Sequence, residues 1–432
     1  MIFEKGVVFE DMKNRIISVL LILGMCTAFA SCGLKQNKEP AENTDGTTES
    51  VITTAEPAPA EPTEVRISFA AAGDNLIHES VYKTAKTNAA ALASTGGPAM
   101  DYYFLEMYSE KLRNIISSAD LAFVNQEAPI VPDRPAAGYP AFNTPTEAGD
   151  TLVEMGFDIV NLANNHMLDM EGQCEGLQST IDYWNSKDIM PVGAYESKDD
   201  YNTLRIMECK GKKIAVLSYT YGTNGNKLNY KSSDLVVPYI NDSTIIEQVS
   251  RAEDYADAVI VSMHWGDENK FAVNAEQKRL AGLLSKYGAD VVIGHHSHTL
   301  QPMEWVTNDL GEKTLVIYSL GNLISSQVEA YNLVGGIATF ELVFSPEGEL
   351  TVENALLTPT VTHYSSDANK TDSQGLATRY GVFVGLLEDY TSDMCESHGT
   401  QITALNGPFT LATLRGYVTS TIAAEFLPDY LK

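Results

Sequence analysis

The feature that most constrains the fold is a short apolar strand followed at once by three histidines. It occupies residues 290–302, with the sequence DVVIGHHSHTLQP. The apolar run VVI predicts a buried strand, because β-branched side chains pack well on an enclosed pleated surface, and Gly294 ends it. Side chains of equal parity on an extended segment point the same way, so we expect His296 and His298 to aim their imidazoles at one point. This pattern is typical of a metal site, although a polar loop with hydrogen-bonded histidines would also fit.

Polar residues able to bind a metal follow several other apolar strands. From residue 65 onward, strands alternate with helices, which predicts an α/β domain. In such domains the functional crevice lies beyond the carboxyl ends of the strands, so distant loops converge there. Each motif alone is compatible with a turn or a helix cap, but together they predict one clustered site. The motifs are Gly73-Asp74-Asn75, Asn125-Gln126-Glu127, Asn164-Asn165-His166, His264-Trp265-Gly266-Asp267-Glu268 and Ser319-Leu320-Gly321-Asn322.

The periodicity of the apolar residues predicts the following elements. Strands are expected at residues 66–72, 121–124, 159–162, 213–219, 258–263, 291–293 and 314–318, with a hairpin at 336–344 and 350–357. Helices are expected at residues 103–117, 146–155, 172–187, 242–255, 274–287, 375–390 and 409–426.

The N-terminal part predicts export and attachment to a membrane. Residues 16–29 form an apolar run that is short for a bilayer span, and Lys13 and Arg15 precede it. Small residues then lead to Cys32, as in a bacterial lipobox, so we expect Cys32 to be lipidated. Residues 33–64 are rich in Pro, Glu and Thr and cannot bury enough apolar area to fold. The expected organisation is a lipoprotein signal peptide (1–32), a disordered tether (33–64), the main domain (65–357) and a helical extension packed on the core (358–432).

Charge and cysteine content narrow the possible partners. The chain has 57 acidic and 29 basic residues and a formal charge of −28, so we expect no nucleic-acid partner. Outside the N-terminal region the cysteines are Cys174, Cys209 and Cys395, whose spacing matches no zinc-binding pattern.

The motifs, taken in order, resemble those of the capsule-synthesis protein CapA family. These are the poly-γ-glutamate capsule proteins related to calcineurin-like metallophosphoesterases, and the resemblance covers residues 65–357. The resemblance implies a four-layer α/β/β/α sandwich with a metal centre at one edge. It also implies surface-polymer biosynthesis or export outside the cytoplasm. The expected partners are the membrane, through the lipid anchor, the surface polymer or its precursor, and other capsule-synthesis membrane proteins.

The resemblance also assigns roles to individual residues. The implied metal ligands are Asp74, Glu127, Asn165, His264, His296 and His298, and His166 would be the free catalytic imidazole beside them. The expected supporting or substrate-binding residues are Asn75, Asn125, Asn164, Glu268, His295 and Asn322. Oxygen and nitrogen ligands suit one or two divalent ions, with manganese, iron, zinc and magnesium all compatible. An ordinary metallophosphoesterase has Asp-x-His on its first strand, whereas this chain has Gly-Asp-Asn there, so one imidazole is missing.

Two functions are compatible with these assignments. The first is a metal-dependent hydrolase of a phosphoester or a γ-glutamyl amide, in which two cations activate a water molecule and His166 protonates the leaving group. The second is a non-catalytic polymer-binding or assembly component that retains the metal-binding residues. The spacing of the motifs does not decide between them.

Overall fold

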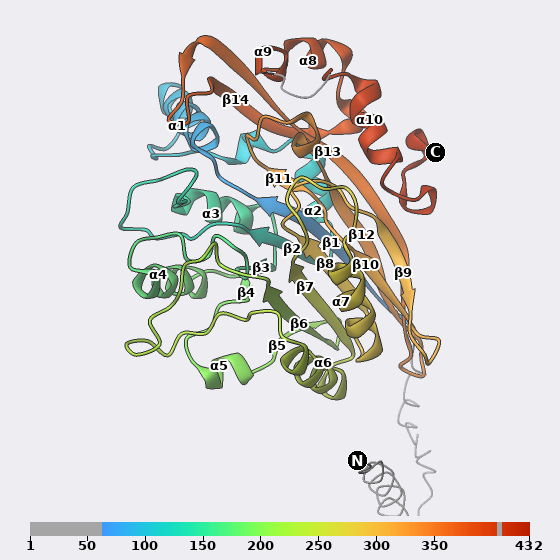
Figure 1. Ribbon diagram of the computed structural model, residues 1–432. Helices are drawn as coiled ribbons and strands as arrows, with labels where there is room; N and C mark the ends of the chain where they lie inside the picture. Colours follow the sequence, from blue (N-terminus) through green and yellow to red (C-terminus); the bar gives the residue numbers. More distant parts are fainter. Residues whose placement is uncertain (1–62, 404–407) are drawn as a thin grey trace, which may run out of the picture. The chain divides into compact units, whose positions relative to one another are not determined.

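Two β-sheets form the centre of the computed structural model, which describes residues 63–403 and 408–432 (Figure 1). The first sheet contains β1 (Val65–Asn75), β2 (Leu121–Gln126), β3 (Ile159–Asn161), β4 (Met190–Val192), β11 (Asn322–Ile324), β12 (Val334–Phe344), β13 (Leu350–Thr371) and β14 (Ala377–Leu386). Its order is β14-β13-β12-β1-β2-β3-β4, and β11 pairs with β1. The second sheet contains β5 (Arg205–Cys209), β6 (Lys212–Thr220), β7 (Ala258–His264), β8 (Val291–His295), β9 (Met303–Thr307) and β10 (Lys313–Ile317). Its order is β5-β6-β7-β8-β10-β9.

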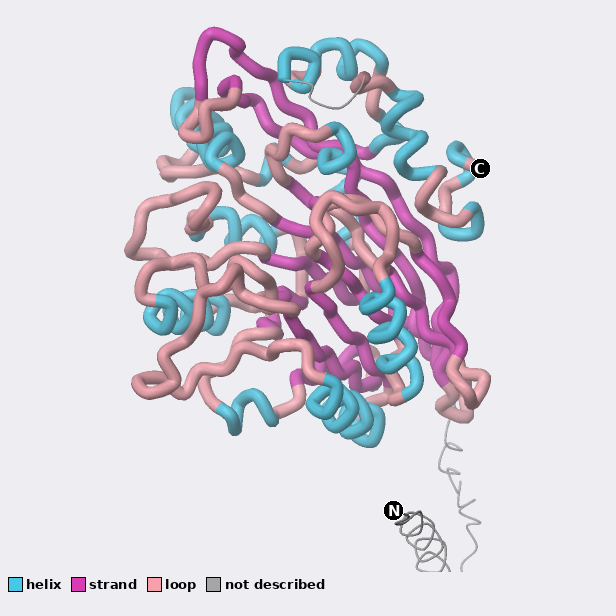
Figure 2. The backbone as a smooth tube through the Cα atoms, viewed as in Figure 1, coloured by secondary structure: helices cyan, strands magenta, loops and turns pink. Residues whose placement is uncertain are grey.

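The helices cover the outer faces of the two sheets (Figures 1 and 2). They are α1 (Glu79–Ser94), α2 (Glu110–Ser117), α3 (Thr146–Glu154), α4 (Gln173–Asn185), α5 (Lys198–Asn202), α6 (Asp242–Tyr255), α7 (Ala275–Lys286), α8 (Ser392–Ser397), α9 (Thr400–Thr403) and α10 (Leu411–Thr419). Helix α7 begins with a capping box, in which Asn274 accepts from the backbone of Gln277 and the Gln277 side chain accepts from the backbone of Asn274.

The second sheet is buried on both faces, and its alternating side chains define the layers. Ile214, Ile260 and Ile293 join a core shared with strands of the first sheet. Their neighbours Val259 and Val292 belong to a second core. Because successive side chains of a strand point to opposite faces, one face packs on the first sheet and the other on α6 and α7. The fold is therefore the α/β/β/α sandwich that the family resemblance implies.

A repeated aspartate contact fixes the register of the parallel strands at their amino ends. The residue just before β2, β3, β7 and β8 is Asp120, Asp158, Asp257 and Asp290, respectively. Each carboxylate accepts a hydrogen bond from a backbone N–H of the neighbouring strand, at 2.7–2.8 Å. The backbone N–H of each aspartate donates in return to that same neighbouring residue. The sequence pattern of an aspartate before an apolar run thus marks where four strands begin.

The parallel strands of each sheet end at the same edge, and this edge carries the polar motifs. Strands β1, β2 and β3 run parallel to each other, as do β6, β7 and β8. A parallel register places their carboxyl ends side by side. The residues that follow these ends therefore meet between the sheets.

The segment after residue 357 differs from its sequence-based prediction. A helix was expected at residues 375–390, whereas Ala377–Leu386 forms strand β14, antiparallel to β13. Its apolar residues from Tyr380 to Leu386 are interrupted only by glycines, so periodicity does not separate a helix from a strand, and pairing with the long β13 decides the outcome. The domain boundary expected at residue 357 falls inside β13, so the extension begins as part of the first sheet. Helix α10 lies within the helix expected at residues 409–426.

Residues 103–117 were expected to form one helix, but they contain a short 3-10 turn followed by α2. Ser109 accepts from the backbone of Leu112 and caps α2 there.

The predicted signal peptide and the lipidation at Cys32 lie outside the described residues, as does nearly all of the predicted tether. Within residues 63–403 and 408–432, no helix is both long and apolar enough to cross a membrane.

Candidate metal centre

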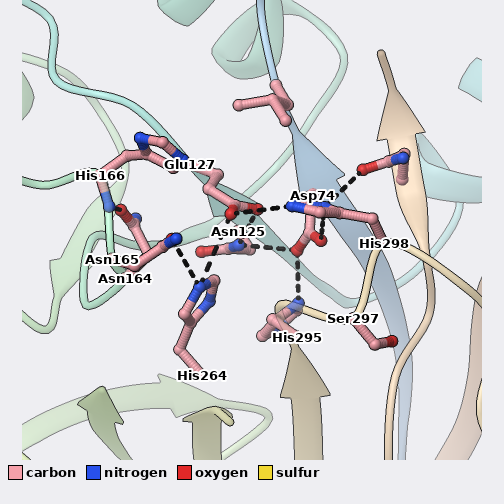
Figure 3. A network of polar contacts seen from close by, with 12 residues as sticks. Asp74, Asn125, Glu127, Asn164, Asn165, His166, His264, His295, Ser297 and His298 are labelled. Atoms are coloured by element: carbon pink, nitrogen blue, oxygen red, sulfur yellow. Dashed lines mark hydrogen bonds and ion pairs between the residues drawn. The ribbon is translucent and has the colours of Figure 1, made fainter. Parts of the chain in front are cut away.

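The side chains predicted to bind metal meet in one buried cluster between the two sheets (Figure 3). Two groups of residues each bring three potential ligand atoms within 4.8 Å of one another. The first group is Asp74, Glu127 and His298, and the second is Glu127, His264 and His296. Glu127 belongs to both groups and lies between them.

Glu127 follows β2 and directs one carboxylate oxygen at the imidazoles of two different loops. Its Oε1 lies 3.6 Å from Nε2 of His264 and 3.6 Å from Nε2 of His298. Asn165 extends the second group, because its Oδ1 lies 3.0 Å from Nε2 of His264. This arrangement is the one expected of a carboxylate that bridges two cation positions.

Asp74 lies at the end of β1 and contacts two further histidines. Its Oδ2 is 3.0 Å from Nδ1 of His298, and its Oδ1 is 3.3 Å from Nδ1 of His295. Asn125 donates from Nδ2 to Oδ1 of Asp74 at 2.8 Å and to Glu127 at 3.5 Å. Asn125 therefore connects and orients the two carboxylates.

The two key histidines converge for a different reason than the sequence predicted. We expected His296 and His298 to share one side of an extended segment. Strand β8 ends at His295, however, and His296 and His298 have φ angles of 94° and 54°. Left-handed backbone is uncommon for residues with a side chain and tends to occur at functional sites. The turn after the strand, rather than strand alternation, directs these imidazoles into the cluster.

Two glycines permit the backbones around the cluster to approach closely. A Cβ atom on Gly73 would lie 2.0 Å from the carbonyl oxygen of Gly321, and one on Gly294 would lie 2.0 Å from that of Tyr318. The Trp265 indole also donates to this Tyr318 oxygen at 3.0 Å. The glycines of the GDN and GHHSH motifs are therefore required by packing.

Burial and mutual contacts shift the pKa values of the cluster in opposite directions. Burial opposes ionisation of Asp74, but the contacts with His295 and His298 outweigh it and hold the Asp74 pKa well below its usual value. Burial, and then the charge of Asp74, raise the pKa of Glu127 well above its usual value. Burial, reinforced by nearby imidazoles, lowers the pKa of His264 well below its usual value and that of His296 to about 3. The lowered pKa values favour the neutral form of His264 and His296, in which imidazoles bind metals. For His298, burial lowers the pKa, but the contact with Asp74 outweighs burial and raises it above its usual value.

The donor set fits a divalent metal. Oε1 of Glu127 and Nδ1 of His296 are buried and have no hydrogen-bond partner among the described residues. A buried polar atom without a partner costs free energy, and a coordinated cation removes that cost for the atom it binds. The cluster offers carboxylate, amide and imidazole donors without a thiolate, a set compatible with manganese, iron, zinc or magnesium.

His166 lies beside the cluster and is held by a carboxylate that the sequence analysis missed. Its Nδ1 is 2.7 Å from Oδ2 of Asp169, and its ring meets Phe142 edge-on with 4.9 Å between ring centroids. The spacing of His166 and Asp169 is a signal that could have been read from the sequence. Asn224 was also missed, and its side chain contacts both Asn165 and His166. It lies 58 residues after His166 in an irregular loop, so the sequence contains no comparable signal for it.

The supporting residues proposed from the sequence take several positions. His295, Asn125 and Asn322 contact the candidate ligands, and Asn322 Oδ1 lies 3.1 Å from Nδ1 of His298. Asn164 instead bonds to backbone groups of its own loop and of Gln126.

Like that of Asn164, the side chains of Asn75 and Glu268 make no hydrogen bond to the candidate ligands among the described residues. Asn75 turns away from the cluster, donating to Gln126 at 2.7 Å and accepting from Tyr108 at 3.1 Å. Glu268 is exposed, and its charge acts on the cluster without a direct hydrogen bond among the described residues. The Asn75 side chain therefore does not hold the candidate ligands, and substrate binding by Asn75 or Glu268 stays a prediction.

The fold and the cluster define a two-sheet α/β protein with a candidate metal centre at the carboxyl ends of its strands. The model of the bacterial capsule synthesis protein family PGA_cap matches residues 68–327. The chain belongs to this family, as its motifs indicated.

Two curated relatives are named CapA. The chain is 34% identical over 185 residues to the PGA biosynthesis protein CapA of Bacillus subtilis, covering 43% of this chain and 47% of that protein. It is 32% identical over 185 residues to the capsule biosynthesis protein CapA of Bacillus anthracis, covering 42% of this chain and 43% of that protein. The chain thus spans about half the length of the curated relatives it matches.

Solved structures with some similarity include an NAD nucleotidase of Haemophilus influenzae, at 14% identity and a TM-score of 0.40, covering 83% of this chain and 60% of that one. A phosphatase of Mycoplasma pneumoniae has 13% identity and a TM-score of 0.42, covering 69% of this chain and 95% of that one.

Proposed function

We propose that this protein is a metal-dependent hydrolase that acts in the biosynthesis or export of a capsule or related surface polymer. The observation that carries the proposal is Glu127, a fully buried carboxylate whose Oε1 lies 3.6 Å from the imidazoles of both His264 and His298. The capsule synthesis family supports the biological setting. The candidate substrates are a phosphoester and the γ-glutamyl amide of a polymer.

The residues would divide into two ligand groups around Glu127. Asp74, Glu127 and His298 would hold one ion, and Glu127, His264, His296 and Asn165 would hold the other. A bound divalent ion supplies Lewis acidity and favours ionisation of a water molecule. Asn125 keeps the two carboxylates in position through its hydrogen bond to Asp74.

His166 would supply the proton that the leaving group needs. Its Nδ1 faces Asp169 at 2.7 Å, which leaves Nε2 as the ring nitrogen available to a substrate. Asp169 fixes the orientation of the ring. A general acid placed in this way contributes about 10²–10⁴-fold to a reaction rate.

We further propose that the protein acts on the outer face of the cell membrane, attached through a lipid on Cys32. The support is the sequence before the domain, in which an apolar run leads to small residues and Cys32. Cys32→Ser should release the protein from the membrane fraction.

The catalytic assignment is tested by His166→Ala in the full-length protein. The substrates are bis(p-nitrophenyl) phosphate and γ-glutamyl-p-nitroanilide, which represent the two candidate bonds. We expect kcat to fall about 100-fold or more on the substrate that is cleaved, with metal content unchanged. His363→Ala is the matched control, because it removes another buried imidazole, in β13. Full activity of His166→Ala with metal still bound would contradict the assignment.

A non-catalytic polymer-binding or assembly role is the alternative, and one observation favours it. The first ligand group has only three side chains, because Leu76 stands two residues after Asp74, where an ordinary metallophosphoesterase has an imidazole. This role predicts that the metal-loaded protein binds a γ-glutamyl polymer and hydrolyses neither chromogenic substrate.

A further inference from the structure

Tyr221 lies directly against the candidate metal centre, although no sequence motif indicates it. It follows β6, and its backbone N–H donates to the carbonyl oxygen of His264 at 3.0 Å. Its ring centroid is 4.5 Å from that of His296. It is also nearly parallel to the His264 ring, at 6.2 Å and 8°. One tyrosine thus touches both imidazoles of the second ligand group.

The exposure of Tyr221 contrasts with that of the residues it covers. His264 and His296 are 0% and 3% exposed, whereas Tyr221 is 47% exposed. One part of its ring therefore rests on the two imidazoles while another part faces solvent. A large half-exposed aromatic side chain at the rim of a buried polar cluster is typical of a ligand contact.

Burial, and then the charges of Glu268 and Glu127, raise the pKa of the Tyr221 phenol to about 12, and its hydroxyl makes a hydrogen bond with the Asn165 side chain. A neutral phenol can donate a hydrogen bond to an oxygen of a bound anion.

The loop that carries Tyr221 is fixed to the centre at several points. Asn165 donates to Oδ1 of Asn224 at 3.3 Å, and Asn224 Nδ2 lies 3.4 Å from Nδ1 of His166. Farther along, Thr223 and the Tyr239 hydroxyl are 3.0 Å apart. These contacts place Tyr221 before any ligand arrives, which reduces the entropy lost on binding.

We propose that Tyr221 contacts the substrate of the candidate metal centre and selects for a ring or planar group beside an anion. The hydroxyl donates to an oxygen of the anion, and the open part of the aromatic ring packs on the neighbouring group. This inference rests on the proposed function, since it takes the cluster to be the substrate site.

The test compares two phosphonates, one of which carries a phenyl group where the other carries a methyl group. Phenylphosphonate and methylphosphonate share the same anionic group, and their P–C bonds are not hydrolysed in a phosphoester reaction. Their binding to the full-length, manganese-loaded protein is measured by isothermal titration calorimetry, with metal content determined in each sample. Tyr221→Phe removes the hydroxyl alone, and Tyr221→Ala removes the hydroxyl and the ring.

We expect Tyr221→Phe to weaken the binding of both phosphonates about tenfold, because one hydrogen bond to a charged group is lost. Tyr221→Ala should weaken phenylphosphonate by about a further fivefold relative to methylphosphonate, because the aromatic contact is also lost. Tyr230→Ala is the matched control, since Tyr230 is on the same loop and is 61% exposed. It should leave both affinities unchanged.

The outcomes separate this inference from the proposed function. The inference is overturned if the metal-loaded wild-type protein and Tyr221→Ala have the same ratio of phenylphosphonate to methylphosphonate affinity. It is also overturned if the metal-loaded wild-type protein binds neither phosphonate. Failure of the full-length protein to retain any divalent metal would instead overturn the metal-dependent function on which the inference rests.

Discussion

Replacement of Glu127 by glutamine should change stability in opposite directions with and without metal. In the metal-free protein, Glu127 is a fully buried carboxylate with an unpartnered Oε1, and Asp74 lies close by. Glutamine has nearly the same shape and no charge. Removing the buried charge should therefore stabilise the metal-free protein by about 1–3 kcal/mol. For a domain of this size, that corresponds to a rise in Tm of roughly 1–4 °C.

Saturating metal should reverse the order of the two Tm values, so that the wild-type protein becomes more stable than Glu127→Gln. An ion present at about 1,000 times its Kd stabilises the wild-type protein by about 4 kcal/mol. Glu127→Gln removes the ligand common to both groups, so we expect this variant to gain far less. Differential scanning calorimetry in EDTA and in manganese chloride measures both effects. A fall in Tm of equal size under the two conditions would refute the reasoning, because it would make Glu127 an ordinary structural residue.

The pH dependence provides an internal check on this prediction. The pKa of Glu127 in the folded protein is raised above its unfolded value. The unfolded state therefore loses its proton first, and the free-energy cost of the buried carboxyl is absent below the unfolded pKa of about 4.3 and grows as pH rises. The stabilisation of metal-free Glu127→Gln should be larger at pH 8 than at pH 5.

Two further predictions concern the stability effects of residues that are not candidate metal ligands. Burial, and then the charge of His363, lower the pKa of His398 to about 3. As the pH falls, His398 is therefore protonated first in the unfolded state. The unfolding free energy of the wild-type protein should fall by up to about 1.4 kcal/mol per pH unit below pH 6.5. Urea unfolding should show that the unfolding free energy falls less between pH 7 and pH 5 in His398→Gln than in the wild-type protein. An equal fall in the two proteins would contradict the lowered pKa of His398. Gly294→Ala would place a Cβ 2.0 Å from the Tyr318 oxygen and should lower the unfolding free energy by about 3 kcal/mol; a wild-type urea midpoint would show that this close approach is not required.

The sequence predicts most of the fold because its buried strands are short apolar runs with clear ends. The predicted helix at residues 242–255 coincides with α6, and β7 and β8 begin where their apolar runs begin. Strand β14 could not be predicted in the same way. Its apolar residues do not favour an extended period over a helical one, and its identity as a strand depends on antiparallel pairing with the 22-residue strand β13.

The candidate site was predictable where ligands follow strands directly. Asp74, Glu127 and His264 are carried to one edge by parallel strands, and this convergence follows from topology. Tyr221 and Asn224 reach the cluster through an irregular loop, whose path depends on tertiary contacts rather than on periodicity. Strand parity also could not describe the turn after β8, because it depends on positive φ angles at individual residues.

The central claim is that Glu127 joins two groups of ligands around a divalent cation. Anomalous diffraction from crystals of the protein grown with manganese chloride tests it most directly. The account predicts an anomalous peak within coordination distance of the Glu127 carboxylate, with His264 and His296 or Asp74 and His298 as further ligands. A well-ordered Glu127 with no anomalous peak beside it, in crystals that contain manganese elsewhere, would contradict the claim.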